Sequence, residues 1–213
     1  MSIHYIAGKG FDSNVYLVDG EDPFLVDTGT GRNHRFVLES LEKITDPGRI
    51  DRIVLTHRHY DHVGGAGGLR DELGATLHIH EVDAAPLREG DSEQTRSVSF
   101  GERMPSLEVE SFQEGEVFSS GERTFRVLHT PGHSAGSVVL FDGSDGSLIS
   151  GDTVFAGGVG RWDLPSGDYG ELVHSLRKLR ELDATDLYPG HGPCARGEAR
   201  AHVQGALRCL GES

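Results

Sequence analysis

Three histidines and one aspartate lie within six residues of the segment 56–65, whose sequence is THRHYDHVGG. These four side chains belong to His57, His59, Asp61 and His62. Neutral imidazole and carboxylate are the ligands that borderline divalent ions prefer. The segment directly follows the apolar run 53–55, which predicts a buried strand. A strand that ends in such a cluster delivers several ligands to one point, so we expect half of a metal site here rather than an ordinary polar loop.

Three further candidate ligands lie far downstream, each at the end of a predicted strand and each directly after a glycine. They are His133, Asp152 and His191. Glycine tolerates the tight turn that aims a side chain at a metal from the end of a strand. Together the two sets supply five histidines and two aspartates. That number is enough for two metal ions that share one carboxylate.

The elements that must position these residues are short strands and a few helices. Alternation and turn residues predict strands at 4–7, 14–18, 24–26, 52–55, 75–80, 107–112, 116–118, 124–128, 137–141, 147–150 and 186–188. Helical spacing predicts helices at 33–44, 63–73, 169–182 and 196–210. Strands in two groups, each with helices after it, predict an α/β protein with two sheets packed face to face and helices outside. No linker is visible, so we expect a single domain over residues 1–213.

One stretch, residues 88–103, is polar and shows no period. It fits a mobile loop over the site or an oligomer contact, and the sequence leaves this choice open.

The charge balance limits the partners that the protein can have. The chain of 213 residues has a formal net charge of −14, from 34 acidic and 20 basic residues. Nucleic acid and anionic membranes both require basic patches, so we expect neither as a partner and predict a small-molecule substrate. The apolar runs are too short to cross a bilayer, and the N-terminus lacks the pattern of a signal peptide. With only two cysteines as well, we expect a cytoplasmic protein.

The segment 56–62, with His133, Asp152 and His191 at these separations, resembles the metallo-β-lactamase superfamily over nearly the whole chain. The resemblance implies an αββα sandwich of two mixed β-sheets with a dinuclear site at one sheet edge. It also implies that the first metal is held by His57, His59 and His133, that the second is held by Asp61, His62 and His191, and that Asp152 bridges them. Asp27, in the Asp27-Thr28-Gly29 turn, is expected behind the ligands, in contact with one of them.

The chemistry of such a site is independent of the family. Two divalent ions about 3.5–4 Å apart convert a bridging water to hydroxide near neutral pH and polarise a carbonyl or phosphoryl oxygen. The predicted reaction is therefore metal-assisted hydrolysis, with Asp61 also orienting the nucleophile. Zinc is the expected ion, and iron and manganese are the alternatives.

Two local runs, 151–155 (GDTVF) and 158–165 (GVGRWDLP), resemble the glyoxalase II branch, which hydrolyses thioesters such as hydroxyacylglutathione. The best-studied members carry a C-terminal glutathione-binding helical domain, which we do not expect here. Arg161 takes the place of their lysine and suits a substrate carboxylate. Asp163 takes the place of their tyrosine, so an ion pair between Arg161 and Asp163 that only holds the loop is an equal alternative. Trp162 either lines the substrate pocket or anchors the loop.

Proteins that resemble this chain in fold include β-lactamases, persulfide dioxygenases and lactonases. The β-lactamases of the family generally lack the bridging aspartate, so Asp152 argues against an antibiotic as the main substrate. A persulfide dioxygenase would use one iron ion, and its loop also reads Gly-Arg-x-Asp, as at positions 160–163. A lactonase of the same fold differs only in substrate. The sequence therefore predicts a dinuclear thioester hydrolase, with the dioxygenase and the lactonase as alternatives.

Overall fold

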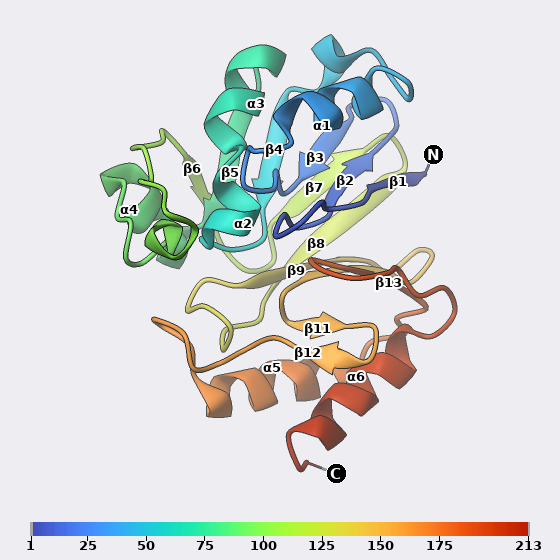
Figure 1. The fold of residues 1–213 in the computed structure, drawn as a ribbon. Coiled ribbons are helices and arrows are strands. Elements are labelled where there is room, and N and C mark those ends of the chain that lie inside the picture. The colour runs from blue at the N-terminus through green and yellow to red at the C-terminus, as the bar shows by residue number, and fades with distance from the viewer. Residues whose placement is uncertain (1, 213) are drawn as a thin grey trace. The chain divides into compact units, whose positions relative to one another are not determined.

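The protein is described by a computed structural model of residues 2–212, which divides into two compact units. The first unit contains the chain up to Phe112 together with the turn Ser119–Arg123. The second unit contains Gln113–Phe118 and the chain from Thr124 onward. Figure 1 shows the elements of both units along the chain.

The first unit is built on a six-stranded mixed sheet. Its strands are β1 (Ile3–Ile6), β2 (Val15–Val18), β3 (Phe24–Val26), β4 (Arg52–Leu55), β5 (Thr76–His80) and β6 (Glu110–Phe112), hydrogen-bonded in this order. The pairs β1–β2 and β2–β3 are antiparallel, whereas β3, β4, β5 and β6 run parallel. Parallel strands carry their carboxyl ends to one edge of the sheet. That edge is therefore where the loop after β4 begins.

The first unit has four α-helices, each with buried residues, and two short 3-10 helices. They are α1 (His34–Leu41), η1 (Pro47–Arg49), α2 (Tyr60–Val63), α3 (Ala66–Leu73), α4 (Glu81–Glu89) and η2 (Ser97–Phe100). The core joins Leu25, Leu41, Ile53, Leu69 and Leu77 with seventeen other buried residues of this unit, so strands and helices share one apolar centre.

The helix predicted at 63–73 is α3, which begins three residues later, at Ala66. Val63 is the last residue of the separate short helix α2, and Gly64 and Gly65 lie between the two helices. A Cβ atom on Gly64 would lie 2.7 Å from the carbonyl oxygen of Thr30, and one on Gly65 would lie 2.5 Å from that of Thr28. The backbone at these two glycines therefore lies too close to the chain at 28–30 for a side chain to fit.

Helix α4 was not predicted. Its buried residues are Asp83, Ala84, Pro86 and Leu87, so its inner face contains an aspartate and a proline instead of an apolar stripe. The polar stretch 88–103 holds the end of this helix and the short helix η2.

The second unit is built on a five-stranded mixed sheet with the order β13-β10-β9-β8-β7. Its strands are β7 (Val117–Ser120), β8 (Arg123–His129), β9 (Val138–Asp142), β10 (Ser147–Gly151) and β13 (Asp186–Pro189). Strand β10 is antiparallel to β9 and parallel to β13. A separate ribbon of β11 (Val154–Phe155) and β12 (Gly158–Val159) follows β10.

Two helices of the second unit, α5 (Tyr169–Arg180) and α6 (Ala199–Cys209), lie side by side in Figure 1 and pack against the core. Helix α5 buries Leu172, Leu176 and Leu179, and α6 buries Ala199, Val203 and Ala206, in each case at helical spacing. The prediction of an α/β protein with two mixed sheets is confirmed.

Among residues 2–212, no helix has the length and apolar character needed to span a lipid bilayer.

Candidate metal centre

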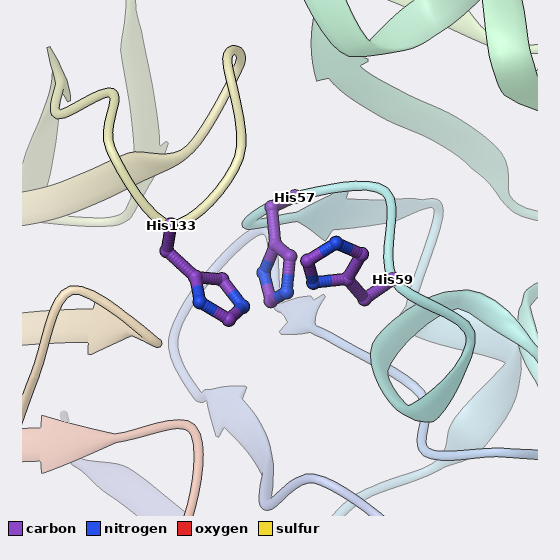
Figure 2. A group of neighbouring side chains, drawn as sticks. All are labelled: His57, His59 and His133. Carbon is purple, nitrogen blue, oxygen red and sulfur yellow. The ribbon is translucent and has the colours of Figure 1, made fainter. Parts of the chain in front are cut away.

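The first ligand group comprises His57, His59, Asp61 and His62, which follow β4 directly and continue into α2. The backbone at His59 is extended, with φ −69° and ψ 144°, and the helix begins at the next residue. Alternate residues of an extended stretch point to the same side, which places His57 and His59 together. Figure 2 shows their imidazole rings on this loop, and the ring centroids lie 4.8 Å apart with perpendicular planes.

The turn into α2 brings His62 back to the same place. Its ring centroid lies 4.1 Å from that of His57, and the three imidazoles of this group are each at most 3% exposed. Asp61 is half-buried, and its carbonyl oxygen accepts a hydrogen bond from the backbone N–H of Ser13. Three neighbouring rings and an accessible carboxylate on one short segment are a ligand set suited to divalent ions.

Asp27 stands behind these ligands, at the end of β3, in a left-handed backbone conformation with φ 61°. Its Oδ1 accepts the backbone N–H of Thr56, and its Oδ2 accepts the Thr56 hydroxyl, both at 2.8 Å. The same Oδ2 lies 2.8 Å from Nδ1 of His62. An ionised carboxylate can only accept, so Nδ1 of His62 carries the proton and Nε2 is the atom that can bind a metal.

The Thr56 hydroxyl extends this network to a second ligand. Its Oγ1 lies 3.1 Å from Nδ1 of His57. The first ligand group is thus held from behind by side-chain hydrogen bonds that begin at one carboxylate. Burial, and secondarily Glu102, raises the pKa of the adjacent Tyr60 phenol above its ordinary value.

The second ligand group comprises His133, Asp152 and His191, all in the second unit. Asp152 follows β10 and His191 follows β13, and because these strands are parallel their carboxyl ends lie at the same edge of the sheet. The backbone N–H of Gly190 donates to the carbonyl oxygen of Gly151 at 2.7 Å. This hydrogen bond holds Gly151 and Gly190 side by side, and each of them directly precedes a ligand.

His133 comes from the loop that follows β8, where Figure 2 also draws its side chain. The preceding Gly132 has φ 131°, and a Cβ atom there would lie 2.3 Å from the backbone nitrogen of Leu172. Gly151 also has a positive φ, of 46°, whereas Gly190 is not among the described glycines with positive φ. Nδ1 of His133 donates to the carbonyl oxygen of Arg161 at 2.7 Å, which leaves Nε2 as its ligand atom.

One carboxylate oxygen lies between the two imidazoles of this group. Oδ2 of Asp152 is 3.5 Å from Nε2 of His133 and 3.7 Å from Nε2 of His191. Ligand atoms about 2.1 Å from a shared tetrahedral ion lie about 3.4 Å apart, so both separations are those of neighbouring ligands. The residues of this unit therefore fit divalent ions by donor type and by spacing.

The loop after β12 lies directly against this second group. A Cβ atom on Gly160 would lie 1.8 Å from the carbonyl oxygen of Asp152 and 3.3 Å from Nδ1 of His133. Next to it, Arg161 and Asp163 form a two-point ion pair with distances of 2.9 and 2.8 Å. Both side chains are more than 60% exposed, and the hydrogen bond to Asp163 raises the pKa of Arg161. Trp162 is 38% exposed and packs edge-on against Tyr169 at the start of α5.

Sequence reasoning missed two residues that support the first ligand group. The carboxylate of Asp83 accepts the backbone N–H of Arg58 at 3.0 Å, and the carbonyl oxygen of Thr95 accepts that of Tyr60 at 2.8 Å. Asp83 lies 25 positions from its partner, and Thr95 acts through its backbone, so neither contact leaves a local pattern in the sequence. A buried aspartate in an amphipathic helix indicates a buried partner, but it can be recognised as buried only after the helix itself is known.

Comparison with known proteins agrees with this geometry. The family model of the metallo-β-lactamase superfamily matches residues 8–191. A probable metallo-hydrolase of Methanocaldococcus jannaschii, MJ0888, is 38% identical over 194 residues, which cover 87% of this chain and 90% of that protein. The hydroxyacylglutathione hydrolase GloC of Haemophilus influenzae is 32% identical over 199 residues, which cover 90% and 91% of the two chains.

Among solved structures, that of TTHA1623 in a di-iron-bound form superposes with a TM-score of 0.77 at 31% identity, covering 94% of this chain and 98% of that one. The chain therefore belongs to the metallo-β-lactamase superfamily, whose fold binds divalent metals and carries metal-dependent hydrolases.

Proposed function

We propose that the protein is a dinuclear metallohydrolase of the glyoxalase II type, which cleaves a hydroxyacyl thioester. The observation that carries the dinuclear part is Oδ2 of Asp152, which lies at ligand spacing from both His133 and His191. A carboxylate placed in this way can belong to two ions at once. The thioester part is supported by the similarity to hydroxyacylglutathione hydrolase GloC over nine-tenths of both chains.

The proposed ligands offer one imidazole nitrogen or carboxylate oxygen each. His57, His59 and His133 would hold the first ion, and Asp61, His62 and His191 the second, with Asp152 shared. When bound, two such ions supply an acidified water and polarise the thioester carbonyl. Zinc is the proposed metal. The di-iron form of TTHA1623 makes iron the first alternative to test.

The chain's own residues would orient the reactants. Asp61 is half-buried, so one carboxylate oxygen can accept a hydrogen bond from the attacking water while the other binds metal. Asp27 keeps His62 in the tautomer that binds through Nε2. The net charge of −14 supports a small-molecule substrate rather than nucleic acid, and we propose a cytoplasmic location.

Arg161 is the proposed contact for a carboxylate on the thiol part of the substrate. Its present partner Asp163 is equally exposed, and exposed ion pairs contribute only about 0–1 kcal/mol. A substrate carboxylate can therefore take the place of Asp163 at little cost. Trp162, half-exposed beside it, is the proposed apolar contact.

A metal and substrate panel tests the proposed function. Metal-free protein is loaded with Zn²⁺ or Fe²⁺ and given a hydroxyacyl thioester of glutathione, one of a smaller thiol, a lactone and glutathione persulfide. We expect thiol release from a thioester with two ions bound per chain. Oxygen uptake on the persulfide with one iron per chain would instead establish a dioxygenase, and lactone opening without thioester cleavage would establish a lactonase.

A further inference from the structure

The residues that alternate with the ligands of the first group are themselves anchored in the protein interior. Arg58, between His57 and His59, is 5% exposed, and Tyr60, which follows His59, is 8% exposed and belongs to the apolar core. A histidine that projects from an extended stretch can be aimed only as well as the backbone that carries it. The contacts of Arg58 and Tyr60 therefore decide where the ligands point.

Asp83 holds Arg58 by both its backbone and its side chain. Oδ2 accepts the backbone N–H of Arg58 at 3.0 Å, and Oδ1 lies 3.3 Å from Nε of the guanidinium. The aspartate is fully buried, in the first turn of α4, where the helix dipole favours a negative charge. One carboxylate thus fixes the main chain and the side chain of the residue between two ligands.

The same part of the chain also holds Tyr60. The segment 81–100, which we call the α4–η2 segment, provides the carbonyl oxygen of Thr95 for the backbone N–H of Tyr60 at 2.8 Å. It also provides Phe100, whose ring centroid lies 5.5 Å from that of Tyr60. Thr95 is fixed in turn by Asp91, whose carbonyl oxygen accepts both its N–H and its hydroxyl.

Stability alone gives little reason for a charged pair at this position. Removing two charges from water costs about as much as their attraction returns, and a buried ion pair replaced by apolar residues of similar volume often leaves stability unchanged. What apolar residues cannot replace is the hydrogen bond from the Asp83 carboxylate to the ligand loop. The contact therefore points to placement of the loop rather than to stability.

We propose that Asp83 is a positioning residue of the metal centre. Through the backbone N–H and the guanidinium of Arg58, it fixes the direction of His57 and His59. The rest of the α4–η2 segment, to which Asp83 belongs, supports the same loop through Tyr60. This inference rests on the proposed metal site.

Three variants separate positioning from stability. Asp83→Ala removes both contacts and leaves Arg58 without its buried carboxylate. R58L/D83L removes the charges together, keeps the volume apolar, and still lacks the acceptor for the backbone N–H. R58Q/D83N removes the charges but keeps a side-chain oxygen at position 83 that can accept it. The exposed pair Arg70–Asp71 of the same unit supplies the matched control, R70Q/D71N.

The measurements are the Zn²⁺ dissociation constant in competition with a chromogenic chelator, the visible spectrum of the Co²⁺-loaded protein, and thermal unfolding of the metal-free protein. Loss of a residue that orients a ligand typically weakens metal binding by about 10–100-fold. We expect that loss in Asp83→Ala and in R58L/D83L, with an altered Co²⁺ spectrum. R58Q/D83N should stay within about fivefold of the wild type, because it keeps the oxygen that accepts the backbone N–H of residue 58. R70Q/D71N should stay within the same limit, because this pair does not contact the ligand loop.

R58L/D83L that binds metal as the wild type does, with the same Co²⁺ spectrum, would overturn the inference and leave the proposed function intact. If R58L/D83L does not fold, R58Q/D83N decides. A folded R58Q/D83N that binds metal as poorly as Asp83→Ala would show that the acceptor oxygen is not what matters, which also overturns the inference. Wild-type protein that binds no Zn²⁺ or Co²⁺ would instead overturn the proposed function, and the inference with it.

Discussion

The two ligand groups are held in place by different means. The first group lies on one continuous segment, and side chains behind it, Asp27, Thr56 and Asp83, fix it by hydrogen bonds. The second group comes from three separate strand ends, and its backbone fixes it. Gly132 and Gly160 allow close contacts that no other residue fits. The carbonyl oxygen of Gly151 accepts the backbone N–H of Gly190, and that of Arg161 accepts Nδ1–H of His133.

The difference teaches where each group is vulnerable. A group held by side chains fails when an oxygen that accepts a hydrogen bond from the group is lost, even if the supporting side chain keeps its shape. A group braced by its backbone tolerates changes in nearby side chains but fails when a methyl group enters a close contact. The following variants test this contrast.

The largest effect is expected for Asp152→Ala. This variant should lose at least one metal ion and about a thousandfold or more in thioester hydrolysis, because an ion contributes several kcal/mol to the transition state. Metal content and thiol release are measured together. Asp183→Ala, at a 98% exposed carboxylate of the same unit, is the control and should match the wild type. Two retained ions with near-normal turnover in Asp152→Ala would contradict the shared ligand.

Gly160→Ala should follow, although it removes no functional group. The new Cβ would lie 1.8 Å from the carbonyl oxygen of Asp152, so this carbonyl and the adjoining His133 must move. We expect a loss of about 1–3 kcal/mol in stability and of about a hundredfold in activity. Gly205→Ala, inside α6 with no contact closer than 3.8 Å, should instead gain about 0.5–1 kcal/mol. If Gly160→Ala and Gly205→Ala have the same stability and activity, close backbone contacts do not hold the second ligand group in place.

Asp27→Asn tests the side-chain brace of the first group. Asparagine tolerates the left-handed backbone at this position, but its amide would donate to Nδ1 of His62 and move the ring proton to Nε2. We expect metal affinity to fall by about 10–100-fold while the metal-free protein keeps its unfolding temperature. The matched control is Asp12→Asn, at a buried carboxylate of the same unit that bonds to Thr30 instead of a histidine. Unchanged affinity in Asp27→Asn would show that the tautomer is set by other means.

Asp163→Asn should have the smallest effect. The ion pair with Arg161 is exposed, so its loss should change the unfolding temperature by less than about 3 °C. Freed from its partner, Arg161 should bind a substrate carboxylate up to about fivefold better, seen as a lower KM for a thioester that carries one. A neutral thioester serves as the control and should be unaffected. A fall in stability without change in KM would make the pair structural only.

The sequence predicts well those elements whose formation depends on residues close to one another in the chain. Strand β4 has the predicted bounds, Arg52–Leu55. A strand that is buried on both faces forms a continuous apolar run, which can be recognised without knowing its neighbours. The first ligand group could also be recognised from the sequence, because its four members lie within six residues. The helices α5 and α6 follow from their apolar stripes.

The parts that could not be predicted depend on distant contacts. Helix α4 carries a carboxylate and a proline on its buried face, and a partner of that carboxylate, Arg58, lies 25 positions earlier in the chain. Within the polar stretch 88–103, Thr95 supports the ligand loop through its carbonyl oxygen, a backbone atom that no pattern of side chains reveals. For the stretch as a whole, the mobile loop and the oligomer contact both stay predictions.

The most direct test of the account is a titration of metal-free protein with Zn²⁺, in which thiol release from a hydroxyacyl thioester is followed at each addition. If both ligand groups serve one dinuclear centre, activity should rise to its maximum at two equivalents of metal per chain. A maximum at one equivalent, or thiol release that never exceeds the metal-free rate, would contradict the central claim.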